Sequence, residues 1–409
     1  MTTPHDHASV HPRFPQARPA SCPFDPPEDY RDWRLREGMQ RVTLWNGSTA
    51  WVVTRFEDIR AVLSDPRISA DGRNPGLPRL SAAGQDQTGA EPPFVRLDDP
   101  EHARQRRMLT ADFTAKRAAA LRPQVQALVD DALDEMIVKG PPADLVTDFA
   151  LPVPSRVIAV LLGVPYEDHA FFQQCSNTLL DMSLPADQVR ETSEHFSAYL
   201  HELIAKKATD PGDDLLSRLL TERVDTGDLT RRQLTSMALL MLIAGHETTA
   251  NTIALGTLAL LRHPRQLALL RDTEDPAAVG RAVEELLRYL SVVENVVVRV
   301  AAEDLTIAGQ EIRAGDGIIV SLPAGNRDTA LLPDRPDVLD LTHNARAHLA
   351  FGFGVHQCLG QNLARMELQV AIPALLRRLP HLKLAIPFDA VPFRQQMSVY
   401  GVTRLPVTW

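Results

Sequence analysis

A single cysteine, Cys358, lies in the most unusual stretch of this 409-residue chain, FGFGVHQCLG at residues 351–360. A helical pattern follows at once. Backbone N–H groups at a helix start and the helix dipole stabilise negative charge, so this position is expected to lower the thiol pKa and favour a thiolate. We expect Gly352, Gly354 and Gly360 to adopt φ > 0 or to let the backbone approach a flat ligand. The stretch therefore predicts a thiolate presented to a metal.

The residues alone also allow three different roles for this cysteine. Free cysteine is commonly buried, so Cys358 could be an ordinary thiol in a turn. A zinc site with His343, His348 and His356 is conceivable, but its spacing matches no familiar site, and a lone thiolate suits haem iron better than zinc. A nucleophile activated by His356 would instead make a thiol hydrolase.

A second group of residues with acidic or hydroxyl side chains interrupts a long apolar run. Residues 230–263 are predicted to form one helix, which Pro264 ends. Within it, the motif AGHETT places Glu247 and Thr248 where packing would prefer leucine. Gly245 lies three residues before Thr248 on the same face, and its missing side chain could open a pocket there. An exposed polar patch is the alternative, but the flanking MALLMLI favours burial.

Three further positions place cations or ion pairs at informative spacing. Glu285 and Arg288 in EELLR lie three apart, where they can pair, as common surface residues also do. His102 and Arg106 lie four apart on a predicted helix after Pro100, a spacing suited to holding a carboxylate; a solvated basic face is the alternative. Arg299 stands inside a valine-rich strand, where a charge is costly unless it is paired.

The elements that must position these residues are mainly helical, with a small β-rich portion. Asn46-Gly47 between two β-prone runs predicts a hairpin, and residues 292–322 are strand-like. No internal repeat is visible. We predict an extended, Pro-rich arm at 1–28 and one large domain at 29–409, in which 71–96 is a flexible substrate-access loop.

Composition narrows the class of protein. The net charge of −9 argues against a nucleic-acid partner. The N-terminal residues include no apolar segment of the kind a signal peptide or membrane anchor needs. Cys22, Cys175 and Cys358 are odd in number and far apart, so no disulfide framework is expected. We expect a soluble, cytoplasmic protein that needs no membrane. The family resemblance described next also implies a bacterial protein that acts as a monomer.

These motifs together resemble the cytochrome P450 superfamily. FGFGVHQCLG is similar to its haem-binding pattern F-G-x-G-x-H-x-C-x-G, AGHETT to its oxygen-activation motif, and EELLR to its E-x-x-R core motif. The phrases FGVHQCLGQNLAR and LPVTW are most similar to soluble actinomycete members of family 105. The resemblance runs from about Val42 to the C-terminus. It implies the cytochrome P450 fold, with haem between the long central helix and the helix that follows the cysteine loop.

The resemblance also implies roles for single residues. Cys358 is the axial ligand of haem b, and its electron donation favours O–O cleavage. Thr248 hydrogen-bonds dioxygen, and Glu247 helps relay protons to it. Glu285 and Arg288 lock the structure behind the haem. The residues implied to hold the cofactor are His102, Arg106, Arg299 and His356 at the propionates, with Ala244, Gly245, Phe351, Gly352 and Gly360 around it.

One family position departs from the usual pattern. The segment ahead of the cysteine loop usually carries arginine in D-x-x-R, whereas this chain has DLTH, ending at His343. A neighbouring arginine, Arg335 or Arg346, is a candidate replacement. Stability and haem retention, rather than reaction type, depend on this position.

The implied activity is a haem-dependent monooxygenase that inserts one atom of O2 into a C–H bond. Its substrate would be a lipophilic secondary metabolite, macrolide, sterol-like compound, statin precursor or xenobiotic. An iron–sulfur ferredoxin and an NAD(P)H ferredoxin reductase would supply electrons, with Arg104, Arg107 and Arg365 as candidate contacts or simply solvated charges. A haem-thiolate protein without monooxygenase activity is the alternative, which Glu247 and Thr248 disfavour. The predicted substrate contacts are Arg73, Val95, Leu179, Leu240, Ile243, Val292, Val296 and Val399.

Overall fold

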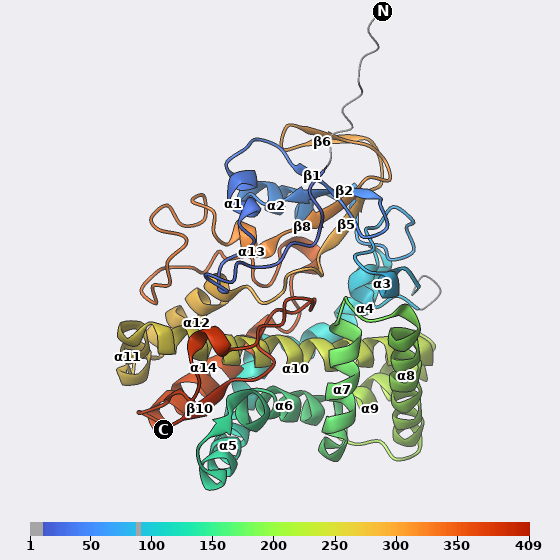
Figure 1. Cartoon of the computed structure of the whole chain (residues 1–409). Coiled ribbons are helices and arrows are strands. Elements are labelled where there is room, and N and C mark those ends of the chain that lie inside the picture. Colours follow the sequence, from blue (N-terminus) through green and yellow to red (C-terminus); the bar gives the residue numbers. More distant parts are fainter. Residues whose placement is uncertain (1–10, 87–90) are drawn as a thin grey trace, which may run out of the picture.

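The computed structural model describes residues 11–86 and 91–409, and helices dominate these ranges. A β-rich region with a few short helices lies at one end of the molecule, and most helices lie in the rest, where β10 is beside α14 (Figure 1). The mainly α architecture with a small β-rich portion is thus confirmed. The α-helices are α1 Asp29–Arg34, α2 Phe56–Ser64, α3 Ala82–Asp86, α4 Glu101–Thr110, α5 Ala115–Lys139, α6 Pro152–Leu162, α7 His169–Leu180, α8 Ala186–Thr209, α9 Leu215–Leu219, α10 Arg231–Arg262, α11 Pro264–Asp272, α12 Pro276–Leu290, α13 Leu322–Gly325 and α14 Gln361–Arg378. The strands are β1 Gln40–Thr43, β2 Thr49–Val53, β3 Ile68–Ser69, β4 Ala143–Asp144, β5 Val298–Ala301, β6 Leu305–Ile307, β7 Gln310–Ile312, β8 Gly317–Val320, β9 Lys383–Leu384 and β10 Pro406–Thr408.

Helix α10 passes through the middle of the helical region (Figure 1). Thr230 caps its start, because its hydroxyl accepts the N–H of Gln233 while the Gln233 side chain accepts the N–H of Thr230. The helix ends at Arg262, and Pro264 opens the next helix. The predicted extent of this helix is confirmed, so AGHETT lies at its centre.

A five-stranded sheet in the order β1-β2-β8-β5-β3 forms the main part of the β-rich region. The predicted hairpin pairs Gln40 with Val52 and Thr43 with Thr49 around Asn46-Gly47. Strand β5 pairs with β8 on one side and β3 on the other, and all its residues are buried. This central place explains how Arg299, a β5 residue, becomes buried.

The cysteine loop joins the β-rich region to α14. Gly354 has φ +73°, and a Cβ there would lie 2.3 Å from the carbonyl oxygen of Leu63 at the end of α2. Glycine is therefore required where the loop packs on that helix. Gly360 has φ −79° and is the N-cap of α14. Of the three loop glycines, Gly352 and Gly354 adopt the left-handed conformation, and Gly360 lines the cavity described below.

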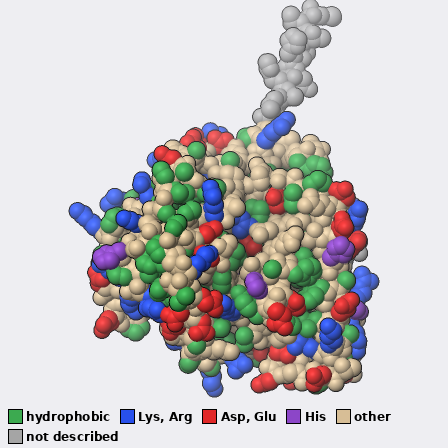
Figure 2. All heavy atoms as spheres, turned by 60° about the horizontal axis from the view of Figure 1, so that its bottom comes forward, with side chains coloured by type: hydrophobic (Ala, Val, Ile, Leu, Met, Phe, Trp, Pro, Cys, Tyr) green, Lys and Arg blue, Asp and Glu red, His purple; other side chains and the backbone are tan. Residues whose placement is uncertain are grey.

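The surface gives little direction about partners. Acidic and basic side chains are interspersed on the face seen in Figure 2, and neither sign covers it. Across residues 11–86 and 91–409, no helix has an apolar stretch long enough to cross a bilayer. The first ten residues of the predicted arm lie outside the described residues, while Phe14 and Arg18 are buried against the domain.

Candidate functional site

A cavity of about 1190 Å³ lies between α10, the cysteine loop, α4 and the segment that leads into β5. Its lining is largely apolar. All the predicted substrate contacts reach it: Arg73, Val95, Leu179, Leu240, Ile243, Val292, Val296 and Val399. Of the predicted cofactor residues, Arg106, Ala244, Gly245, Arg299, Phe351, Gly352, His356, Cys358 and Gly360 line the same cavity. Residues from distant parts of the sequence thus meet at one site.

Cys358 is exposed to this cavity, although protein atoms pack closely around its sulfur. Burial raises the pKa of the Cys358 thiol, and the backbone N–H groups of Gly360 and Gln361 and the charges of Arg106 and Arg365 lower it only in part. The expected fall in pKa is therefore wrong for the chain alone, because loss of hydration outweighs the helix start. A positive group at the sulfur is needed to hold the thiolate.

Helix α10 presents Ala244 and Thr248 to the cavity. The Thr248 hydroxyl donates to the Ala244 carbonyl at 2.8 Å, so this hydroxyl lies against the backbone of α10. At Gly245 a Cβ would lie 2.8 Å from side-chain atoms of Ile158 on α6. The absent side chain at this position therefore permits close packing of two helices at the wall of the cavity, which Gly245 and Ile158 both line.

Glu247 points away from the cavity into the protein interior and is 1% exposed. Its Oε2 accepts from Arg394 at 3.0 Å and from Asn251 at 3.2 Å. Its Oε1 has no hydrogen-bond partner and lies 3.6 Å from Nε2 of His246. Burial raises the pKa of Glu247, but His246 and Arg394 outweigh it and hold the pKa below its usual value. The buried acid is thus held ionised, with one oxygen left free.

Arg106, Arg299 and His356 line the cysteine side of the cavity, and the buried His102 lies behind His356. The rings of His102 and His356 lie 4.0 Å apart, and both Nε2 of His102 and Nδ1 of His356 are buried without a hydrogen-bond partner. Burial lowers the pKa of His356 to about 3, with Arg299, His102 and Arg106 adding to the effect. In the described ranges, neither arginine forms an ion pair. The cluster is poised for anions.

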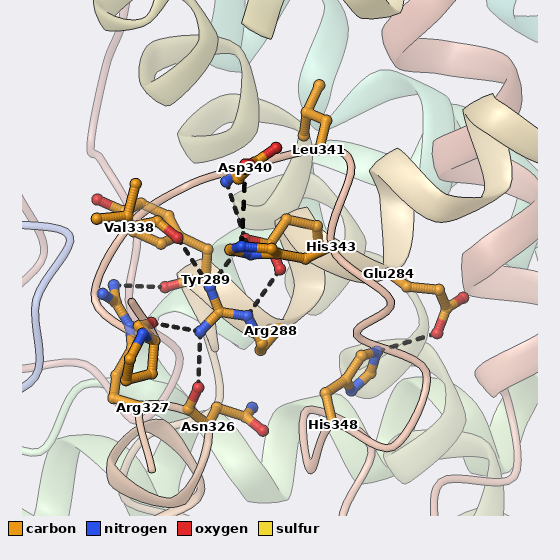
Figure 3. Close-up of polar contacts among 12 residues, drawn as sticks. Glu284, Arg288, Tyr289, Asn326, Arg327, Val338, Asp340, Leu341, His343 and His348 are labelled. Atoms are coloured by element: carbon orange, nitrogen blue, oxygen red, sulfur yellow. Dashed lines mark hydrogen bonds and ion pairs between the residues drawn. The ribbon is translucent and has the colours of Figure 1, made fainter. Parts of the chain in front are cut away.

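The predicted Glu285–Arg288 pair is fully buried, and Arg288 lies close to Asn326, Val338 and His343 (Figure 3). Its nitrogen–oxygen distances are 2.7 and 2.8 Å. His343 itself is the third partner, since its Nδ1 lies 3.1 Å from Oε1 of Glu285. Neither candidate arginine takes that place. The remaining N–H groups of Arg288 donate to the carbonyls of Asn326, Pro336 and Val338.

A neighbouring cluster ties α12 to the cysteine loop. Glu284 accepts both Arg365 nitrogens, at 2.7 and 3.1 Å, and lies 3.1 Å from Nε2 of His348 (Figure 3). Burial raises the pKa of Glu284, but His348 and Arg365 outweigh it and lower the pKa to about 2. Arg365 also lies over the Phe351 ring. Arg365, a candidate ferredoxin contact, is therefore engaged within the chain.

Two cavity residues escaped the sequence reasoning. Glu367 on α14 is 2% exposed, and its Oε2 has no hydrogen-bond partner. Burial raises the pKa of Glu367 well above its usual value, so this carboxyl is neutral. Arg96 also lines the cavity. An acid within the apolar helix pattern and an arginine in FVRLDD were the available signals.

The geometry supports neither a zinc site nor a thiol nucleophile at Cys358. No group of three or more His, Cys, Asp or Glu in residues 11–86 and 91–409 could hold a metal ion, which removes the zinc cluster there. With a pKa of about 3, His356 is too weak a base to activate a thiol at neutral pH.

The family model described as Cytochrome P450 matches residues 35–275 and 277–398. The chain belongs to the cytochrome P450 family. Cytochrome P450-SU2 of Streptomyces griseolus is 52% identical over 100% of this chain and 98% of its own. The crystal structure of cytochrome P450 MoxA from Nonomuraea recticatena, described as CYP105, has a TM-score of 0.88 and 46% identity over 97% of this chain and 98% of that one.

A solved structure with a bound substrate is also similar to this P450. It is the mycinamicin VIII C21 methyl hydroxylase MycCI from Micromonospora griseorubida bound to mycinamicin VIII. It has a TM-score of 0.92 and 40% identity over 97% of this chain and 100% of that chain. The P450 fold and the actinomycete family 105 type are thereby confirmed, and the chain is a P450 monooxygenase.

The family implies haem with a cysteine thiolate ligand, and the residues of this chain fit that group. Cys358 faces a cavity large enough for a flat macrocycle. Orphaned nitrogens of His102 and His356 and the unpaired guanidinium groups of Arg106 and Arg299 suit two carboxylates. A ferric ion would supply the positive charge that the Cys358 sulfur lacks.

Proposed function

We propose that this P450 hydroxylates a large lipophilic small molecule, with electrons from an iron–sulfur ferredoxin and its NAD(P)H-dependent reductase. One observation carries the proposal: Cys358 and Thr248 face the same cavity, which continues along apolar walls. Its volume of about 1190 Å³ exceeds the roughly 300–1,000 Å³ typical of ligand pockets, leaving room for cofactor and substrate together. The hydroxylase MycCI, bound to mycinamicin VIII, supports a substrate of that size.

The reaction combines a C–H substrate, O2, two electrons and two protons to give an alcohol and water. Bound haem supplies the oxygen-activating and oxidising chemistry. The chain would hold it through Cys358, with His102, Arg106, Arg299 and His356 as donors to its two carboxylates. The paired charges behind the loop keep the cysteine in place.

We assign proton supply to Glu247 and Thr248. The Thr248 hydroxyl borders the cavity, whereas the carboxylate of Glu247 lies behind the helix wall, held by Arg394. A proton taken up at the free Oε1 of Glu247 must cross this wall to reach the Thr248 hydroxyl, through a water or by rotation of the acid. Protons from Glu247 would therefore reach Thr248 only from the side of α10 that faces the protein interior.

The substrate would be bound chiefly by apolar contact. Leu179, Leu240, Ile243 and Val399 come from separate elements and form walls without hydrogen-bonding side chains. Arg73 reaches the cavity, but its guanidinium already pairs with Asp71 at 2.7 Å and Glu101 at 2.9 Å. Its charge is compensated, so we assign Arg73 to holding the 71–96 loop.

The test begins with the purified protein and its Cys358→Ser variant. The reduced, carbon-monoxide-bound wild type is expected to show the red-shifted band that gives the family its name, and the variant to lose it. Lipophilic metabolites that displace water from the iron are then identified by the change in spin state, and their products by mass analysis. Absence of the band in the wild type would overturn the proposal.

Proton delivery is tested by Thr248→Ala, with Thr252→Ala as matched control. Thr252 lies one turn further along α10 and also lines the cavity, where its hydroxyl donates to the Thr248 carbonyl. We expect Thr248→Ala to keep the carbon-monoxide spectrum and consume NAD(P)H, but to divert electrons to hydrogen peroxide. The control should remain coupled. Equal product yield per NAD(P)H in both variants would contradict the role of Thr248.

A further inference from the structure

Arg96 meets Arg299 at one backbone atom beside the cavity. Arg96 ends the short helix Phe94–Arg96, and its Nη1 donates to the carbonyl oxygen of Val298 at 3.4 Å. Nη1 of Arg299 donates to the same oxygen at 2.9 Å. The Nη2 of Arg96 is fixed by the carbonyl of Val296 at 2.8 Å. Two guanidinium groups from distant segments are thus held close together.

Their charges are not compensated by the chain. Neither arginine forms an ion pair with any residue in 11–86 or 91–409. Asp98, the acid nearest in effect to Arg299, already accepts from the Ser69 hydroxyl and the Ala70 N–H. Burial lowers the pKa of Arg96 to about 10, and repulsion from Arg299 and Arg79 adds to this. Two neighbouring guanidinium groups without an acid partner repel each other, and a bound anion would stabilise both.

We propose that Arg96 and Arg299 together bind one haem propionate. The inference rests on the proposed function, because it needs haem in the cavity. Both arginines line that cavity and retain N–H donors beyond those given to the carbonyls of Val296 and Val298. The pair lies in the same cavity as His356 and Cys358 of the cysteine loop. A carboxylate bound by two guanidinium groups is held by charge and by geometry.

A substrate carboxylate is the other source of the same chemistry, so the experiment has two arms. The first follows haem transfer from the holoprotein to excess apomyoglobin, for wild type, Arg96→Gln, Arg96→Lys and the control Arg73→Gln. Arg73 also lines the cavity, but it is paired with acids. We expect haem loss to become about tenfold faster in Arg96→Gln, with an intermediate rate for Arg96→Lys and no change in the control.

Two readouts separate a propionate contact from general destabilisation. The ferric/ferrous midpoint potential should fall in Arg96→Gln, because a cation near the iron favours the reduced state, and Arg96→Lys should restore most of it. Circular dichroism on heating reports folding independently. If Arg96→Gln does not fold, Arg96→Lys decides: it keeps the charge but loses the planar fork, so faster haem loss is expected and a wild-type rate overturns the proposal.

The second arm titrates dodecanoate and its methyl ester into the holoproteins and reads the spin-state change. Unchanged haem loss in Arg96→Gln, with or without weaker binding of dodecanoate alone, overturns the propionate assignment. Weaker binding of the acid but not of the ester would then identify a substrate carboxylate. A wild type without the thiolate band would instead show that the proposed function itself fails.

Discussion

The two sides of the cysteine loop treat buried charge in opposite ways. Behind the loop, Glu285, Arg288 and His343 form one paired cluster, and Glu284 with its partners forms another. Facing the cavity, the buried Arg299 and the half-buried Arg96 and Arg106 form no ion pair with any acid in the described ranges. Because unpaired buried charge is costly, the second side is built for a group that the sequence does not encode.

This difference separates scaffold from site. A buried charge with its partner in the chain fixes the loop whether or not a cofactor is bound. A buried charge without one makes the empty pocket unfavourable, and the bound group then contributes to stability. Substitutions on the first side remove one member of a charge pair, and substitutions on the second side remove a group that has no partner.

The largest effect is expected from Arg288→Met. It leaves Glu285 buried without its arginine partner, together with three carbonyls that lose their donor. Breaking such a buried pair typically costs roughly 3–5 kcal/mol, against a total stability of roughly 5–15 kcal/mol. We expect little folded protein, measured as the yield of protein with native circular dichroism.

The matched substitution on the cavity side is Arg299→Met. It removes a buried cation without leaving an acid behind, so the folded polypeptide should accumulate while haem content falls. Comparable loss of native circular dichroism in both variants would remove the distinction between the two sides.

Glu284→Gln gives the next largest effect, and it depends on pH. The pKa of Glu284 is about 2, below its ordinary 4.5, so its contribution to stability is present above pH 4.5 and is lost as the pH falls toward 2. The shift corresponds to an upper bound of about 3 kcal/mol. We expect the wild type to unfold at higher urea than the variant at pH 7, with the gap closing in acid. A constant gap would contradict the ion pair.

Features set by residues close together in the sequence could be predicted, whereas features that depend on distant residues could not. The cysteine loop, AGHETT and the Glu285–Arg288 pair are short-range patterns, and each lies where the pattern placed it. The partner of Glu247 is Arg394, 147 residues away, and no local spacing announces it. Gly245 does line the cavity, but its packing against Ile158 on another helix could not be predicted from local sequence. The expectation for the thiol pKa failed because burial, which local sequence does not show, exceeds the effect of a helix start.

Glu367→Gln should show the opposite pH dependence from Glu284→Gln. The pKa of Glu367 is raised by burial, so folding holds its proton and this carboxyl costs stability as pH rises above 4.5. Glutamine keeps the shape without the acid. We expect the variant to match the wild type near pH 4 and to exceed it at pH 8 in thermal unfolding. A less stable variant at pH 8 would mean that the carboxylate is ionised and paired.

The smallest effect is expected from replacing His343, which belongs to the paired cluster with Glu285 and Arg288. Its Nδ1 lies 3.1 Å from Glu285 and its Nε2 lies 3.9 Å from Asp340, so an acid flanks each ring nitrogen. Arginine, usual here in related sequences, would keep its charge at every pH and could bond Glu285 through two N–H groups. We expect His343→Arg to gain about 1 kcal/mol, or a melting temperature higher by about 1 °C.

The gain should come from the charge and fork of the new side chain, so His343→Ala is the matched control. Alanine leaves Glu285 bonded to Arg288 and to the N–H of Asp340, and a modest loss of stability is expected. If the His343→Ala variant were as stable as the wild type, His343 would contribute nothing to the stability of the cluster. If arginine were less stable than histidine, the loop ahead of Cys358 would have closed around the smaller ring, and the departure from the family pattern would be a matter of packing and not of charge.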